Sequence, residues 1–277
     1  MWIGNPGSLR EIKDGAKSYD RSPDLGVTEF RALSGGVTTW APPARPRRVK
    51  ASWELMQRAD FEHLDALARR LTAPGPVALV DPLAGNLLGG AQAAGIGNTS
   101  KWAAKPAGAV LLYGGSFGDY VANTVSVEAT PGALYWQHPT WPGVPVAPGS
   151  VLTWWVPGLV ESGAPVGSLR VEWYSAAGAV ISTTTGGGAR PMVTTVPAGA
   201  AYIRPGAEFT ATGMWALGAS VLALGDVSAA VMAGARPTGE GCPAYSITGY
   251  SHTASAGDGR FRDIALELVE VTGSANG

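Results

Sequence analysis

The stretch Arg260-Phe-Arg-Asp-Ile-Ala-Leu-Glu-Leu-Val-Glu-Val271, close to the C-terminal end of the chain, decides our prediction of the fold. Ile264, Leu266 and Leu268 alternate with smaller or charged residues, which is the two-residue period of a strand with one buried face. After Leu268 the apolar residues change phase, which indicates a bulge or an end covered on both faces. A strand this regular needs partners, and comparable strands lie near the N-terminus. The final strand is therefore predicted to complete a domain that the first residues begin.

The charged residues are unevenly spread, and this places the domain boundaries. Residues 1–81 hold 22 of the 41 charged residues, whereas residues 82–240 hold 13 although they span more than half of the chain. Such a change of composition indicates a second domain inserted into the first. We predict a first domain of residues 1–88 and 241–277, an inserted domain of residues 101–225, and linkers at residues 89–100 and 226–240.

The fold class predicted for the whole chain is mainly β. Its first domain is expected to be a β-sandwich with one helix, because short alternating stretches dominate residues 1–56. Gly35-Gly36 is predicted to turn the chain into a strand over residues 37–40. The helix is expected to start at Asp60 as its N-cap and to end before Pro74. Its apolar stripe consists of Phe61, Leu64, Leu67, Ala68 and Leu71.

The inserted domain is predicted to be a β-jelly roll. Its strands are short and bounded by Gly, Pro or Ser, as in sandwiches and jelly rolls. Within residues 169–174, Leu169, Val171 and Trp173 face one way and the intervening side chains face the other.

Bulk composition restricts the class of protein. Hydrophobic residues make up 45% of the chain and charged residues 15%, which is typical of a folded protein. One cysteine, Cys242, excludes an intrachain disulfide. The first residues lack the pattern of a secretion signal, and no apolar run has transmembrane length. We expect synthesis in the cytoplasm and no membrane insertion.

Two groups of residues, together with the early helix, carry a resemblance. The first group is Val77-Ala-Leu-Val-Asp-Pro-Leu-Ala-Gly-Asn-Leu-Leu88 and the final strand, which resemble the distal tail proteins of long-tailed bacteriophages. The second is residues 169–182 and 196–204, which are similar to carbohydrate-binding jelly rolls. The resemblance covers most of the chain through patterns of fold.

The resemblance implies a structural virion protein at the tail tip. It implies a homo-oligomeric ring, a hexamer in that family, which contacts the tail tube protein and the tail-tip hub proteins. The inserted jelly roll either contacts host-surface polysaccharide or is decoration. An alternative from a different class is a soluble carbohydrate-binding protein that forms no ring.

The proline-bounded segment from Ala41 to Arg48 cannot be a central strand, because each proline removes a hydrogen-bond donor. We interpret it as a hairpin tip or arm. Its candidate contact residues, Arg45, Arg47 and Arg48, suggest a partner protein more than nucleic acid, because the chain has a net charge of −1 and no aromatics interleave with them.

The residues expected of an enzyme are missing from the sequence. The three histidines, His63, His138 and His252, are far apart and have no metal-ligand spacing. Glu128 and Glu172 form a conceivable glycosidase pair, but Glu172 lies in a regular strand and is expected to be a solvated or sheet-face carboxylate. We therefore expect no catalytic site, no bound metal and no cofactor.

Aromatic residues are the candidates for ligand contact. Tyr135, Trp136 and Trp141 lie in a proline-interrupted segment that we predict to be a loop. Flat aromatic rings beside polar groups suit stacking on a sugar ring, whose C–H face is apolar. Covering one end of the sandwich or a subunit contact is the commoner role of such rings, since aromatics also dominate protein interfaces. Both interpretations stay open at this stage.

These glycan-contact candidates give a first testable expectation. Replacing Trp136 and Trp141 by alanine is expected to abolish glycan binding and to leave assembly intact, because the rings would supply the stacking surface. Binding to host polysaccharide and particle mass measure the two effects. Unchanged binding would contradict the assignment.

Overall fold

The computed structural model describes residues 1–23, 26–40, 46–81, 83–254 and 260–271. The predicted mainly β fold is confirmed, and its strands form several antiparallel sheets. The chain forms two compact units. The frame unit comprises the described residues within 3–5, 10–79 and 243–277, and the inserted unit comprises those within 1–2, 6–9 and 80–242.

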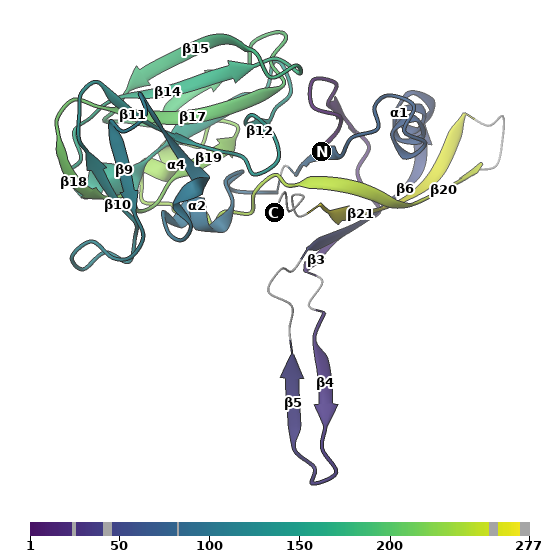
Figure 1. The fold of residues 1–277 in the computed structure, drawn as a ribbon. Coiled ribbons are helices and arrows are strands. Elements are labelled where there is room, and N and C mark those ends of the chain that lie inside the picture. The colour runs from purple at the N-terminus through teal and green to yellow at the C-terminus, as the bar shows by residue number, and fades with distance from the viewer. Residues whose placement is uncertain (24–25, 41–45, 82, 255–259, 272–277) are drawn as a thin grey trace. The chain divides into compact units, whose positions relative to one another are not determined.

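The frame unit contains a seven-stranded sheet, a separate two-stranded hairpin and one helix (Figure 1). The sheet order is β2-β1-β7-β20-β21-β6-β3. The bounds are β1 (Trp2–Gly4), β2 (Arg10–Glu11), β3 (Ser18–Pro23), β4 (Thr28–Arg31), β5 (Val37–Trp40), β6 (Arg47–Gln57), α1 (Arg58–Ala68), β7 (Val77–Val80), β20 (Ala244–Ala254) and β21 (Phe261–Glu270).

The final strand, β21, lies between β20 and β6 in this sheet. Ile264 is opposite Trp53 and Leu268 is opposite Val49, and all four side chains are buried. The predicted pairing of the last strand with an N-terminal strand is therefore confirmed. A register shift occurs in the neighbouring strand β20, opposite Leu268, so the irregularity expected at this point lies in the partner strand.

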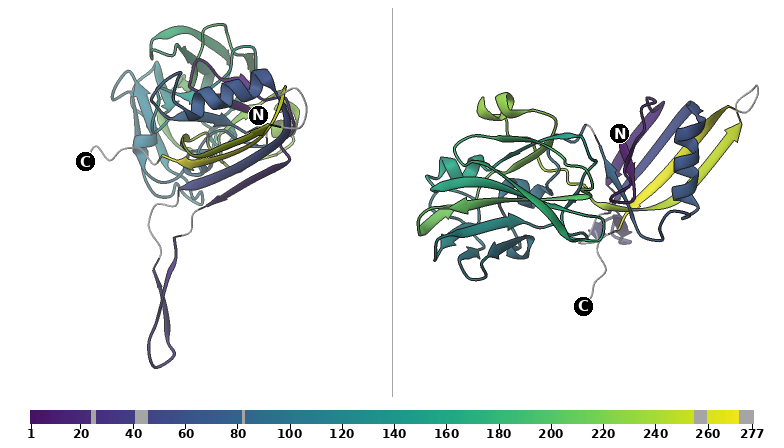
Figure 2. Two further views of the ribbon diagram at one scale, coloured as in Figure 1. Left: turned by 90° about the vertical axis from the view of Figure 1, so that its right-hand side faces the viewer. Right: turned by 90° about the horizontal axis from the view of Figure 1, so that it is seen from above.

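Helix α1 packs on β6, β20 and β21 and lies across one face of the sheet (Figure 2). Leu64 and Leu67 from the predicted stripe are buried, whereas Leu71 lies beyond the helix and is 65% exposed. The expected N-cap is wrong, because the helix begins two residues before Asp60. Asp60 instead lies in the first turn, where the helix dipole favours an acid, and pairs with Arg10 at 2.8 Å.

The predicted arm is displaced along the sequence. Residues 41–45, which include Arg45, lie outside the described residues, and Arg47 and Arg48 begin β6. The hairpin is formed by β4 and β5, with its turn at residues 32–36. The amide of Ala32 donates to the carbonyl of Gly36 at 2.8 Å, and Gly35 has the positive φ of +85° that such a turn requires.

The inserted unit contains three sheets and short helices. Their orders are β15-β14-β17-β11-β8 with β12 beside β17, β18-β10-β9, and β16-β13-β19. The bounds are α2 (Gly90–Ala94), the 3₁₀ helix η1 (Thr99–Lys101), β8 (Trp102–Lys105), β9 (Val110–Tyr113), β10 (Thr124–Val127), β11 (Gly132–Trp136), β12 (Val144–Pro145), β13 (Val151–Trp155), α3 (Pro157–Glu161), β14 (Val166–Tyr174), β15 (Val180–Gly187), β16 (Met192–Thr195), β17 (Tyr202–Phe209), β18 (Gly213–Ala216), β19 (Val221–Leu224) and α4 (Ser228–Met232).

One hydrophobic core joins these sheets into a sandwich (Figure 2). Trp136 of the large sheet meets Trp154 of the β13 sheet edge to face, with ring centroids 4.8 Å apart. The indole N–H of Trp154 donates to the carbonyl of Gly206 at 2.9 Å, so the buried polar group is satisfied across the core. Trp173 is also fully buried, as its alternation predicts.

The segments predicted as linkers contain packed structure. Ala93 lies in the core of the inserted unit, and α2 and α4 fall within these segments. Leu87 and Leu88, which were predicted to belong to the first domain, lie in the same core. Buried Asn86 explains the packing, because its amide donates to the carbonyls of Ser220 and Pro237. Its side-chain oxygen accepts from the amides of residues 88 and 222. The main stretch of this unit therefore runs from residue 80 to residue 242, and residue 88 is not its boundary.

Leu55 gives a prediction for the stability of the frame unit. It has a φ of +55°, is 60% exposed and lies where the β6–β21 register shifts. A left-handed backbone costs a residue with a side chain roughly 1–2 kcal/mol, which glycine avoids. Leu55→Gly is expected to raise the free energy of unfolding by about 0.5–1 kcal/mol, measured by denaturant titration.

Lys50→Gly is the matched control for this measurement. Lys50 is an exposed residue of the same strand whose φ is not positive. Glycine at this position removes side-chain packing from a regular strand and should lower stability. Equal destabilisation by both substitutions would show that Leu55 is not strained.

Candidate binding surfaces

Two of the three predicted glycan contacts are buried. Tyr135 and Trp136 belong to strand β11 and not to a loop, and they are 2% and 1% exposed. Trp136 lies in the core, and Tyr135 lies over Gly206 on the opposite face of the sheet, where a glycine is needed to make room for the ring. This burial removes both residues from the set of candidate contacts. Trp136→Ala would therefore disturb the core.

Trp141 is the remaining candidate, and it is partly exposed. Its ring stacks on His138, with centroids 5.0 Å apart, and is tilted toward Tyr202. His138 holds the loop: its Nδ1 accepts from the amides of Thr140 and Trp141 at 3.1 and 3.2 Å. Its Nε2 must then carry the proton that it donates to the carbonyl of Cys242 at 2.9 Å. Trp141 is thus presented by a fixed loop.

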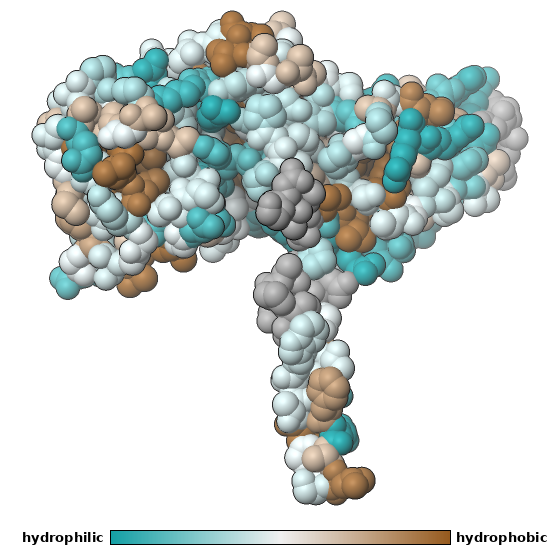
Figure 3. All heavy atoms as spheres, in the orientation of Figure 1, coloured by the Kyte–Doolittle hydropathy of each residue, from teal (hydrophilic) through white to brown (hydrophobic). Residues whose placement is uncertain are grey.

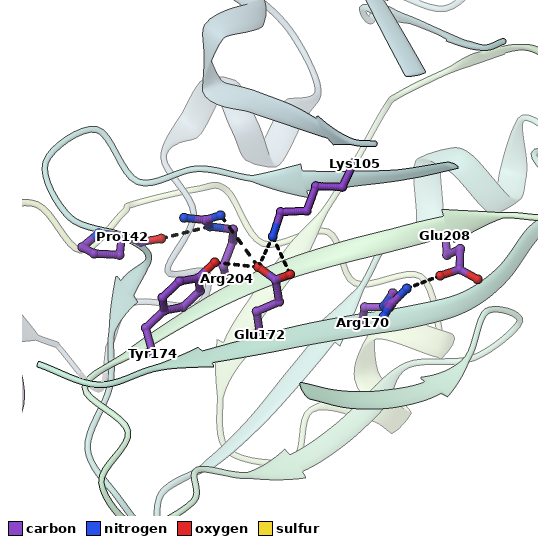
Figure 4. A network of polar contacts seen from close by, with 7 residues as sticks. All are labelled: Lys105, Pro142, Arg170, Glu172, Tyr174, Arg204 and Glu208. Atoms are coloured by element: carbon purple, nitrogen blue, oxygen red, sulfur yellow. Dashed lines mark hydrogen bonds and ion pairs between the residues drawn. The ribbon is translucent and has the colours of Figure 1, made fainter. Parts of the chain in front are cut away.

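A charged network lies on the outer face of the large sheet, next to this loop (Figure 4). Glu172 accepts from Lys105 at 2.6 and 2.9 Å and from the Tyr174 hydroxyl at 2.6 Å. Arg204 lies 3.7 Å from the same carboxylate and donates from Nε to the carbonyl of Pro142 at 3.0 Å. The network therefore ties β8, β14 and β17 to the segment that carries Trp141.

Two further residues extend this polar face. Arg170 pairs with Glu208 across β14 and β17. Lys105 reaches Glu172 by passing over the ring of Tyr135, with Nζ 4.9 Å from the centroid. Each carboxylate of this face is paired with a cation, so the surface offers fixed donors and acceptors with little net charge.

The ionisation of Glu172 argues against acid catalysis. Burial raises its pKa, but the hydrogen bonds from Lys105 and Tyr174 outweigh burial and the net pKa is lowered. Burial and the hydrogen bond to Glu172 raise the pKa of Tyr174. The Tyr174 hydroxyl therefore stays protonated and donates this hydrogen bond. A glycosidase acid needs a raised pKa. Glu128 accepts a hydrogen bond from the hydroxyl of Ser126 in strand β10, which belongs to a different sheet.

The remaining titratable candidates have structural contacts. His63 hydrogen-bonds the carbonyl of Ile3 at 2.9 Å, and burial lowers its pKa. His252 packs beside Tyr250 with centroids 5.8 Å apart. Within the described residues, no group of three or more His, Cys, Asp or Glu side chains is arranged to hold a metal ion. None of the described helices is long and apolar enough to cross a membrane.

The candidate arginines that the structure describes belong to the frame sheet. Arg47 pairs with Glu270 of β21, through its backbone amide at 3.0 Å and its guanidinium at 3.3 Å. Arg47 therefore helps to fix the start of β6. Arg48 follows in the same strand with an exposed side chain.

The hairpin of β4 and β5, here called the arm, is a surface that the sequence did not single out. All eight of its strand residues are exposed. Thr28 is opposite Trp40 and Phe30 is opposite Thr38, so these four residues share one face, called the arm face. Phe30 and Trp40 are 59% and 58% exposed. The available signal was one aromatic residue on each strand of this segment, Phe30 and Trp40.

Comparison with known proteins gives no assignment: no protein-family model matches the chain, and no curated protein matches it significantly.

His138 generates a prediction about pH. Burial lowers its pKa from the ordinary 6.5 to about 4. Because the folded state disfavours the protonated ring, the contribution of neutral His138 to the free energy of unfolding is fully present above pH 6.5. It is lost as the pH falls toward 4. We expect the chain to lose up to about 3 kcal/mol of stability over this range, measured by denaturant unfolding at pH 7 and pH 4.

His138→Asn provides the comparison, since its side-chain oxygen can still accept the two loop amides but does not titrate. The variant should lose less stability than the wild type between the two pH values. Equal losses would contradict a role of His138 in the pH dependence.

Proposed function

We propose that this chain is a structural subunit of a bacteriophage tail tip, which assembles with copies of itself into a closed ring at the distal end of the tail tube. The resemblance of residues 77–88 and of the final strand to distal tail proteins supports this proposal. In such a ring the tail tube protein and tail-tip hub proteins would be neighbours, and the mature location would be the virion.

The single observation that carries the proposal is the exposed arm. A two-stranded hairpin is at best marginally stable in water without a further strand or a covering surface. This arm nevertheless exposes Phe30, Val37 and Trp40, each more than half accessible. Large apolar side chains on an exposed ribbon are typical of a protein contact. A second copy that covers the arm face would bury these rings and stabilise the hairpin.

The edges of the frame sheet are consistent with assembly. The seven-stranded sheet ends at β3 on one side and at β2 on the other. Edge strands offer unpaired backbone groups, and closed symmetric assemblies cover them. β3 carries Asp20 and Arg21, charged residues of the kind that prevent uncontrolled pairing of edges.

The inserted unit is proposed to present a glycan-contact surface outward from the ring. Trp141 supplies an aromatic face, and the network around Glu172 supplies oriented donors and acceptors next to it. This combination suits a sugar, whose ring stacks while its hydroxyl groups hydrogen-bond. The same surface also supports the alternative, a soluble carbohydrate-binding protein that carries this surface but forms no ring.

Arm substitutions test the assembly. Phe30→Ser with Trp40→Ser removes both rings from the arm face and should convert rings into monomers. Light scattering gives the mass, and negative-stain images of the same sample show whether the particle has a central hole. The matched control is Glu29→Gln with Thr39→Ala on the opposite face, which should assemble like the wild type.

Two results would contradict the proposal. Rings that form equally well without Phe30 and Trp40 would remove the observation that carries it. A wild-type chain that remains monomeric over a wide concentration range and binds polysaccharide would favour the alternative.

A further inference from the structure

One cation on the outer face of the large sheet has fewer partners than its chemistry calls for (Figure 4). Arg204 of β17 donates from Nε to the carbonyl of Pro142, and its Nη1 lies 3.7 Å from the carboxylate of Glu172, which is too far for a hydrogen bond. Among the described residues, none accepts a hydrogen bond from the two terminal nitrogens of Arg204. A guanidinium carries five N–H donors, so most of them remain for another group.

Glu172 does not satisfy Arg204, because its oxygen atoms already accept other hydrogen bonds. Lys105 donates to both oxygens at 2.6 and 2.9 Å, and the Tyr174 hydroxyl donates to one of them at 2.6 Å. Two cations therefore share one carboxylate, and Lys105 makes the closer pair. The positive charge of Arg204 is only partly neutralised within the inserted unit.

The charges of the whole outer face agree with this imbalance. The strand register places three cations and two carboxylates on this face of the sheet, and these residues are Lys105, Arg170, Arg204, Glu172 and Glu208. Arg170 pairs with Glu208 and Lys105 pairs with Glu172. The connecting segments around Trp141, residues 137–143, 175–179 and 196–201, contain no acidic residue. One positive charge, that of Arg204, is therefore left in excess.

Arg204 is held in one orientation. Its guanidinium lies over the ring of Tyr174, 4.6 Å from the centroid, and its Nε is bound to the Pro142 carbonyl. The side chain is 21% exposed, so part of it stays accessible to a ligand. A planar guanidinium fixed in this way offers its remaining N–H groups as a fork, which matches the two oxygens of a carboxylate.

A partly exposed aromatic ring lies beside this cation. Trp141 directly precedes Pro142, whose carbonyl holds Arg204, and its ring centroid is 6.4 Å from that of Tyr202. Tyr202 lies two residues before Arg204 in β17, so both side chains are on the same face of the sheet. A stacking surface and a fork for a carboxylate are therefore neighbours on the outer face.

The apolar surface of the inserted unit lies on a different sheet. Leu111, Tyr113 and Met214 are exposed on the sheet β18-β10-β9, where Figure 3 shows a hydrophobic region. The outer face of the large sheet instead combines charged groups with the ring of Trp141. A ligand for this face must therefore be polar and must also have a flat apolar side that can stack.

We propose that the glycan-contact surface binds an acidic sugar, whose carboxylate pairs with Arg204 while its ring stacks on Trp141. This inference rests on the proposed glycan contact and names the class of ligand. In a uronic acid the carboxylate is attached directly to the sugar ring, so one rigid unit supplies both contacts. The carboxylate provides the negative charge that this face lacks and accepts the hydrogen bonds that Arg204 has left.

Calorimetric titration with oligosaccharides tests the requirement for charge. The probes are oligomers of galacturonate, glucuronate and mannuronate at neutral pH, each compared with its methyl ester, which has the same ring but no charge. The wild-type protein is expected to bind at least one acid about tenfold more tightly than its ester, as a charge-assisted hydrogen bond provides. This preference should shrink at high salt, which screens the charges.

Substitutions of arginine identify the cation. Arg204→Gln removes the charge while its amide can still donate to the Pro142 carbonyl, and this variant should bind acid and ester equally. Arg204→Lys keeps the charge without the planar fork and should retain part of the preference. Arg190→Gln is the matched control, because Arg190 is exposed between β15 and β16, outside the strands of the large sheet, and this variant should keep the full preference.

The stacking contact is tested separately. Trp141→Ala should weaken the binding of acid and ester by the same factor, because stacking does not depend on the charge of the ligand. A loss confined to the acid would contradict the assignment of Trp141 to the sugar ring. Circular dichroism of every variant confirms that the fold is retained.

The outcomes separate this inference from the proposed function. Esters that bind as tightly as the acids, or a preference that survives in Arg204→Gln, would overturn the pairing with Arg204 and leave a glycan-contact surface for neutral sugars. Tighter binding of a glycerol phosphate polymer than of any uronate would overturn the choice of a carboxylate. A wild-type protein that binds neither acids nor esters would overturn the glycan contact as well, whereas the ring is judged by particle mass. A preference lost in Arg204→Gln and kept in Arg190→Gln would establish the inference.

Discussion

The frame unit depends on the pairing of β21 with β20 on one side and β6 on the other. This pairing joins the last part of the chain to its first part, and the buried residues Ile264, Leu266 and Leu268 provide the apolar face on which it rests. It also explains how a whole unit can be inserted. The chain leaves the sheet at β7 and returns at β20, and these strands are hydrogen-bonded neighbours, with Ala244 opposite Ala78. The two ends of the insertion therefore meet as paired neighbours within the frame sheet.

Within the inserted unit, strand β14 has one apolar face and one polar face. Leu169, Val171 and Trp173 pack in the core on one side, whereas Glu172 forms ion pairs with Lys105 and Arg204 on the other. The buried carboxylate stabilises the fold only because donors from neighbouring strands surround it. The polar face is therefore rigid, and any ligand there would meet groups that are already oriented. The arm has the opposite character, since its aromatic side chains lack cover within the described chain and a lone hairpin is marginally stable.

Sequence reasoning succeeded where a regular alternation continued over many residues. The period of two around Leu266 and Leu169 predicted two strands and their buried faces. It failed where long-range contacts decide. Trp136 was assigned to a loop because prolines follow it, yet the core that receives it is built by Trp154 and other distant residues. Residues 89–100 were predicted to be a linker because they are small and rich in glycine. The contacts of nearby Asn86 with residues 220 and 237, which hold this part of the chain in the inserted unit, cannot be read from local pattern.

Hydrogen–deuterium exchange of the arm across protein concentrations tests the central claim, that the arm is an interface between copies, most directly. The amides of residues 28–40 should exchange rapidly in dilute protein, because a lone hairpin opens readily. At concentrations where the mass in solution rises, the account predicts that the same amides exchange at least tenfold more slowly, while amides of β21 remain equally protected throughout. Rapid exchange of the arm in the assembled protein would contradict the account, because the aromatic face would then be uncovered in the particle.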